Sequence, residues 1–115
     1  MAMQRKDYRP ENVKSRFPDS IAPLVNGKAL LKAAKKHNAM IMATNMRCRL
    51  PVEGIVLASM AAKAPVMYEI AKSELTYTEF TPASFVDYIV KENERLGNTE
   101  VPFAVHADHL TVKKK

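Results

Sequence analysis

Short apolar runs alternate with amphipathic segments through most of the chain. Three continuous apolar runs fit strands that are buried on both faces of a sheet: residues 39–44, 66–70 and 101–105. Three further segments carry apolar residues at helical spacing: residues 27–36, 51–63 and 82–96. The resulting order is helix, strand, helix, strand, helix, strand. Because strands that alternate with helices are joined by right-handed crossovers, the pattern predicts a parallel α/β sheet.

The expected helix ends are marked by residues with known end preferences. Asn26 is expected to cap the first helix, and Pro51 suits the first turn of the second. Thr81 followed by Pro82 combines an N-cap with a proline at the first helical position, and Gly97 fits the end of that third helix.

Residues 1–26 keep neither a strand nor a helix period and contain three prolines. They are expected to form an irregular N-terminal arm, with the α/β body at residues 27–115. The 115 residues fit one domain of roughly 100–200 residues. They are too few for a complete (β/α)8 barrel, which needs about 250.

Composition narrows the class of protein. Hydrophobic residues make up 47% and charged residues 26%, as in ordinary globular proteins. No apolar run approaches the ~18 residues of a membrane span, so no membrane partner is expected. The basic N-terminus lacks the apolar segment of a secretory signal, and the single Cys48 cannot form an internal disulfide. A cytoplasmic location is therefore expected, and Cys48 has no evident base beside it that would make it a nucleophile.

The net charge of +6 admits a nucleic acid or a phosphorylated substrate as partner. Most of the positive residues gather in three groups: residues 5–16, 28–36 and 113–115. There is no Trp, the four Tyr are scattered, and neither a zinc-finger spacing nor an aromatic RNA-binding motif is present. This pattern favours solvated basic faces, and no nucleic-acid partner is expected.

Candidate chemistry lies where the expected strands end, because parallel α/β folds bind ligands at the carboxyl ends of their strands. The third strand runs into His106-Ala107-Asp108-His109. In extended chain, His106 and Asp108 point to one side and His109 to the other, so one group can ligate a metal while another moves a proton. The motif is weak by itself, since catalytic zinc normally takes three protein ligands.

The sequence around this motif resembles a known family. Residues 101–109, with Lys113 and Lys114 after them, are similar to the strand-3 signature of class II, zinc-dependent ketose-bisphosphate aldolases. Upstream segments resemble the same family in order and spacing: residues 28–37 its opening helix, 43–45 its first strand end, and 62–67 the start of its second strand. The resemblance covers about residues 27–115 and implies a partial (β/α)8 barrel, with about the first three strands and their helices.

The resemblance also implies roles for individual residues. Asp108 matches the catalytic aspartate that moves protons when the carbon–carbon bond breaks or forms. His109 matches the first histidine that binds the catalytic zinc, His106 is adjacent to the site, and Asn45 matches a substrate-binding asparagine. The implied activity is reversible aldol cleavage of a phosphorylated ketose, such as fructose 1,6-bisphosphate in glycolysis, to dihydroxyacetone phosphate and an aldehyde.

The chain also departs from the family pattern. Ala71 stands where the family often has a serine that contacts substrate, with Ser73 two residues on, and Leu110 follows His109 in place of a small residue. The family's later zinc histidines and phosphate loop have no match. We therefore expect an incomplete fragment, inactive alone, that is oligomeric or needs the missing C-terminal portion. A small α/β domain that binds a metal or phosphate without lyase activity is the alternative, and a basic nucleic-acid module is disfavoured.

Overall fold

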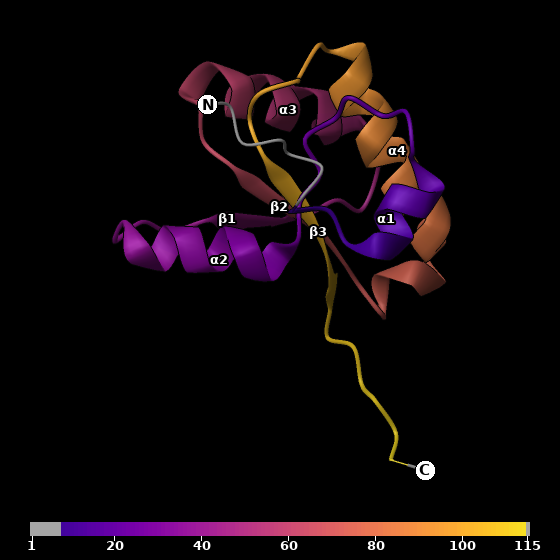
Figure 1. Cartoon of the computed structure of the whole chain (residues 1–115). Helices are drawn as coiled ribbons and strands as arrows, with labels where there is room; N and C mark the ends of the chain where they lie inside the picture. The colour runs from indigo at the N-terminus through magenta and orange to yellow at the C-terminus, as the bar shows by residue number, and fades with distance from the viewer. Residues whose placement is uncertain (1–7, 115) are drawn as a thin grey trace.

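The computed structural model describes residues 8–114 (Figure 1). The first seven residues of the expected arm and Lys115 lie outside the described residues. The described elements are, in chain order, α1 (Glu11–Arg16), α2 (Gly27–Lys36), β1 (Met42–Asn45), α3 (Leu50–Ala62), β2 (Val66–Ala71), the 3-10 helix η2 (Glu74–Thr76), α4 (Pro82–Arg95) and β3 (Phe103–Asp108). No helix among residues 8–114 has the length and apolar character needed to cross a membrane.

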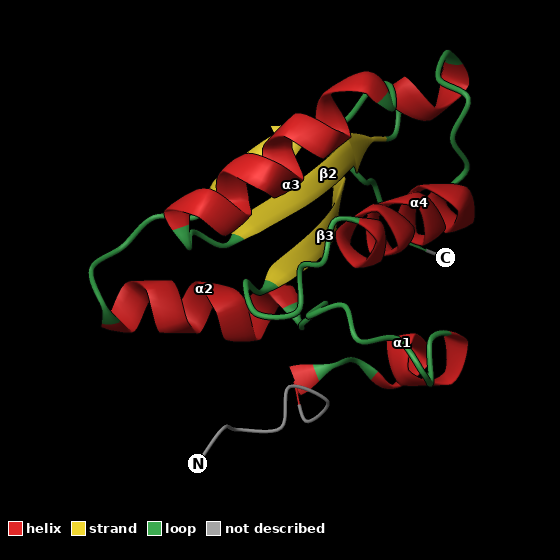
Figure 2. Ribbon diagram, turned by 90° about the horizontal axis from the view of Figure 1, so that it is seen from above, coloured by secondary structure: helices red, strands yellow, loops and turns green. Residues whose placement is uncertain are grey.

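The three strands form one parallel sheet in the order β1-β2-β3. α3 and α4 pack on one face of this sheet and α2 packs on the other, and Figure 2 shows α3 running alongside β2. The α/β prediction is therefore confirmed. Three parallel strands alternating with helices make up a partial (β/α)8 barrel, as expected.

Each face of the sheet has its own apolar cluster. The larger cluster packs the side chains of Tyr68 and Phe103 edge to face, with ring centroids 5.7 Å apart, against Ile89 of α4. Burial raises the pKa of the Tyr68 hydroxyl to about 12. The smaller cluster holds Met67 and Ala104 under Leu30 of α2. Successive side chains of a strand point to opposite faces of the sheet, so neighbouring strand residues enter different clusters.

The predicted helix ends are confirmed. The Asn26 side chain accepts a hydrogen bond from the Lys28 backbone N–H at 2.8 Å. Thr81 and Ser84 form a reciprocal capping box, with each hydroxyl accepting from the other residue's backbone N–H. Gly97 adopts a φ of +77° after α4, a conformation that glycine takes without steric cost.

Two of the strands differ from the prediction. β1 begins at Met42 rather than Ala39, and Met42 and Ala43 are exposed, so it is not buried on both faces. The reason is its position at the sheet edge, which a local apolar run does not reveal. β3 continues to Asp108, so His106 and Asp108 lie within the strand rather than after it.

The segment expected to be irregular contains a short helix, α1 (Glu11–Arg16). Six residues are too few for a helical period to stand out in the sequence. The segment also packs on the body, because Leu24 bridges Phe103 in parallel along the outer edge of β3. Arg9 is 7% exposed and donates to the backbone carbonyls of Phe17, Ser20 and Ala22, which holds this part of the chain in a fixed path.

Candidate functional site

The polar side chains at the carboxyl ends of the three strands line one pocket of about 600 Å³. Asn45 ends β1, Ala71 ends β2, and Asp108 ends β3. The strand register pairs Ala71 with Asp108, which brings these ends to the same edge of the sheet. The structure thus brings Asn45 and Asp108, two of the residues singled out in the sequence, to one pocket. The Asn45 side-chain amide donates to Asp108 Oδ2 at 3.4 Å.

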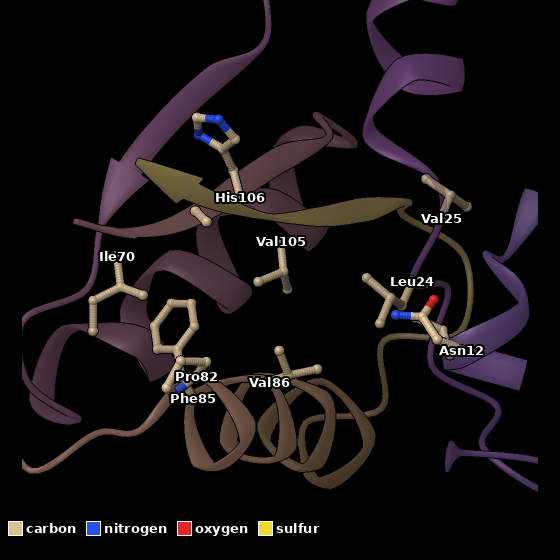
Figure 3. A pocket seen from close by; sticks show the side chains of 11 residues that line it. Asn12, Leu24, Val25, Ile70, Pro82, Phe85, Val86, Val105 and His106 are labelled. Carbon is tan, nitrogen blue, oxygen red and sulfur yellow. The ribbon is translucent and has the colours of Figure 1, made fainter. Parts of the chain in front are cut away.

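His106 and Asp108 lie on the same face of β3, as their spacing predicts. Figure 3 shows the His106 imidazole on the opposite side of the strand from the Val105 side chain, which points toward α4. His106 is paired in register with Glu69 of β2, and its Nδ1 lies 2.7 Å from Glu69 Oε2. Sequence analysis missed Glu69, since its partner is set by strand register rather than by a local motif.

Glu74 in η2 is the second residue that sequence analysis missed. Its side chain is buried, at 3% exposure, and accepts three hydrogen bonds. The donors are Ala71 N at 2.9 Å, Asn45 Nδ2 at 2.5 Å and Arg47 Nε at 2.7 Å. Burial by itself would raise the pKa of this carboxyl, but these three hydrogen bonds and the Arg47 charge outweigh burial, and the net pKa is lowered. Glu74 is therefore held as a carboxylate beside the pocket.

His109 follows the end of β3 and has a positive φ of 52°. Its side chain is 82% exposed, and Nε2 lies 3.7 Å from Asp108 Oδ1. An exposed imidazole beside a carboxylate is a side chain of the type that binds zinc. It supplies one ligand, and catalytic zinc takes three from protein. The described residues around His109 thus fit a zinc site in chemistry and provide part of its ligand set.

A second arrangement of possible metal ligands is present on the sheet face. Among residues 8–114, one group of three potential donor residues has its ligand atoms within 4.8 Å of one another: Glu69, His106 and Asp108. This group does not include His109. Asp108 therefore lies near both His106 and His109, and the sequence motif alone does not show which of the two histidines would bind a metal.

Cationic and hydroxyl groups complete the pocket. Arg47 and Lys72 line it with their side chains exposed, and Lys72 Nζ donates to Thr111 Oγ1 at 3.2 Å. Ser73 also lines the pocket, two residues after Ala71, which stands where the family often has a serine. Cys48 is exposed and does not line this pocket. The pocket therefore combines two carboxylates, an amide and positively charged side chains, and the positive charge suits a ligand with an anionic group.

A smaller cavity of about 250 Å³ lies on the other face of β3, between that strand, α4 and the segment before α2 (Figure 3). Its walls are mostly apolar side chains, among them Leu24, Phe85, Val86 and Val105. It brings no group of acids and bases together. The strand-end pocket is therefore the candidate site.

The chain was compared with family models and with curated proteins. The family model described as class-II fructose-bisphosphate aldolase matches residues 25–114. A search of curated proteins finds no match to the chain. The matched span begins just before α2 and includes all three strands and the candidate site. The chain belongs to the class II fructose-bisphosphate aldolase family.

Proposed function

We propose that this chain supplies part of the active site of a zinc-dependent class II aldolase. The reaction is the reversible cleavage of a ketose bisphosphate, such as fructose 1,6-bisphosphate, to dihydroxyacetone phosphate and an aldehyde. The observation that carries the proposal is the meeting of Asn45 and Asp108 at the carboxyl edge of a sheet that lies within the matched family span. A cytoplasmic location remains part of this prediction.

Each residue of the pocket has a role in the proposed reaction. Asp108 is the catalytic group that exchanges a proton with the substrate as the carbon–carbon bond breaks or forms. Asn45 binds the substrate, and the exposed cations Arg47 and Lys72 attract its phosphate. His109 is one ligand of zinc, which when bound polarises the ketose carbonyl.

Zinc binding tests the assignment of His109. With one family ligand present, the wild-type chain should bind zinc weakly in calorimetry and show no aldolase turnover alone. Tight 1:1 binding that is lost in His109→Ala would contradict the view that the ligand set here is partial. Tight binding that is lost in His106→Ala instead would favour the alternative function, a small metal-binding α/β domain, because His106 belongs to the group with Glu69 and Asp108.

Complementation tests the lyase activity itself. The chain is co-expressed with the later strands of a class II aldolase, and release of dihydroxyacetone phosphate from fructose 1,6-bisphosphate is measured with a coupled enzyme. We expect turnover that requires zinc and is abolished by Asp108→Asn. The matched control is Asp19→Asn, on an exposed aspartate of the N-terminal segment. Absence of turnover in every combination would reject the proposed activity.

A further inference from the structure

We propose that Glu74 is a positioning residue of the strand-end pocket, whose buried carboxylate fixes the Asn45 amide beside Asp108. The consequence for a substrate rests on the proposed function. The positioning itself rests on the contacts of Glu74 alone. None of the segments that carry the family resemblance in the sequence includes this residue.

The carboxylate of Glu74 joins two separate strand ends. Its Oε1 accepts from Ala71 N, at the end of β2, and from Asn45 Nδ2, at the end of β1. Its Oε2 accepts from Arg47 Nε, in the loop after β1. Glu74 is only 3% exposed, and removing its carboxylate would leave the buried Ala71 N–H without a hydrogen-bond partner. One side chain therefore ties together the two loops that frame the pocket.

The contact also decides which way the Asn45 amide faces. An asparagine side chain has one end that donates and one end that accepts hydrogen bonds. Its Nδ2 lies 2.5 Å from Glu74 Oε1 and 3.4 Å from Asp108 Oδ2. Carboxylates only accept, so the opposite orientation would set Asn45 Oδ1 against both of them. Glu74 thus holds the donor end toward Asp108 and leaves Oδ1 as the acceptor that a ligand hydroxyl can use.

Glu74 places a second group at the pocket as well. The Arg47 side chain is 67% exposed, and its bond to Glu74 Oε2 at 2.7 Å holds it at the pocket wall. This hydrogen bond raises the pKa of the Arg47 guanidinium, which favours its protonated, positively charged form. The same buried carboxylate therefore orients an amide that faces Asp108 and a cation that suits a phosphate.

Nuclear magnetic resonance of the Asn45 side-chain amide in the whole chain tests the positioning directly. In the wild type, the Nδ2 protons should exchange with water about tenfold or more slowly than those of the exposed Asn38, because they are hydrogen-bonded to a carboxylate. Glu74→Gln keeps the size of the side chain but removes its charge. It should shift the Asn45 signals and speed their exchange severalfold, and Glu74→Ala should bring the exchange close to that of Asn38.

Glu79→Gln is the matched control, because Glu79 follows in the same loop and its carboxylate pairs with Arg49 at 3.2 Å on the surface. It should leave the Asn45 signals unchanged. Backbone exchange at Ile89 in the core reports whether each variant is folded. If Glu74→Ala unfolds, Glu74→Gln decides the matter alone. Asn45 signals that are the same in folded Glu74→Gln as in the wild type would overturn the proposal.

Titration with dihydroxyacetone phosphate, carried out on the chain co-expressed with the later strands of a class II aldolase, separates this proposal from the proposed function. We expect binding by the wild type and by Glu79→Gln, and an affinity about tenfold lower for Glu74→Gln. If the wild type fails to bind while the Asn45 signals respond to Glu74→Gln, the proposed function fails and the positioning stands. If the wild type and Glu74→Gln bind equally and the Asn45 signals are unchanged, the positioning fails and the proposed function stands.

Discussion

Glu69 on β2 and His106 on β3 are register partners on adjacent strands, and Glu69 Oε2 lies 2.7 Å from His106 Nδ1. The glutamate side chain is 13% exposed and the histidine side chain 49%. An ionised carboxylate can only accept a hydrogen bond, so beside an ionised Glu69 the Nδ1 atom is the donor. A neutral imidazole in this tautomer presents Nε2 as an acceptor on the same face as Asp108.

This relationship predicts the tautomer of His106. Nitrogen-15 spectra at a pH where the ring is neutral should show the Nδ1–H form in the wild type. Glu69→Gln should move the population toward the Nε2–H form, because the charged acceptor is lost. His37, exposed after α2, is the internal control and should not change. A wild-type ring that is mainly in the Nε2–H form would show that the pair is not formed in solution.

Acid stability should report the charge of Glu74. Its pKa in the folded chain is below the ordinary value of 4.5, since the hydrogen bonds from Ala71, Arg47 and Asn45 outweigh burial. The unfolded chain therefore binds more protons than the folded one below about pH 4.5, and the stabilisation is present above that pH and lost as the pH falls further. In urea unfolding, the wild type should lose more stability between pH 5 and about pH 3 than Glu74→Gln does. Glu79→Gln should follow the wild type, and parallel curves for all three would contradict the prediction.

Features set by neighbouring residues were predictable from the sequence. The caps at Asn26 and Thr81 depend on side chains within three residues of the bond they make, so residue type and spacing predict them. The alternation of His106 and Asp108 follows in the same way from strand geometry. The parallel order of the sheet follows from the alternation of elements along the chain.

Features set by distant contacts were not predictable. Glu74 bonds to Asn45 across 29 residues, and Glu69 meets His106 across 37. Both pairs depend on register and on the path of a loop that has no strong local signal. The exposure of β1 was misjudged for a related reason, because an apolar run does not show whether its strand lies at an edge.

The capping box of α4 should contribute measurably to stability. Thr81→Ala removes the hydroxyl that accepts from Ser84 N at 3.1 Å, and should lower the free energy of unfolding by about 1 kcal/mol. Thr99→Ala, at an exposed position before β3, is the control and should change it by less than about 0.5 kcal/mol. Urea unfolding followed by circular dichroism measures both. Equal effects of the two substitutions would show that the box is not formed.

The main apolar cluster should be far more sensitive than the exposed apolar surface. Phe103 is 1% exposed and packs against Tyr68, so Phe103→Ala should cost about 3–5 kcal/mol through lost burial and the cavity left behind. Met40 is 96% exposed, and Met40→Ala should be close to neutral. Thermal and urea unfolding measure the difference. A small effect of Phe103→Ala would mean that β3 is not packed on α4 as described.

The edge at β1 should promote association between copies of the chain. Within residues 8–114, β1 pairs only with β2, and Met42 on it is 53% exposed. An open strand edge beside exposed apolar side chains is a template for pairing with another chain, and a lysine there opposes such pairing. Met42→Lys should therefore lower the self-association measured by sedimentation velocity.

Leu50→Lys is the matched control for this last substitution. Leu50 is 88% exposed at the start of α3, so the change removes a similar apolar surface and adds the same charge away from the strand edge. Met42→Lys should reduce association clearly more than Leu50→Lys, because only Met42 lies on β1. Equal reductions would attribute association to general surface hydrophobicity and charge, and a monomeric wild type would exclude pairing at this edge.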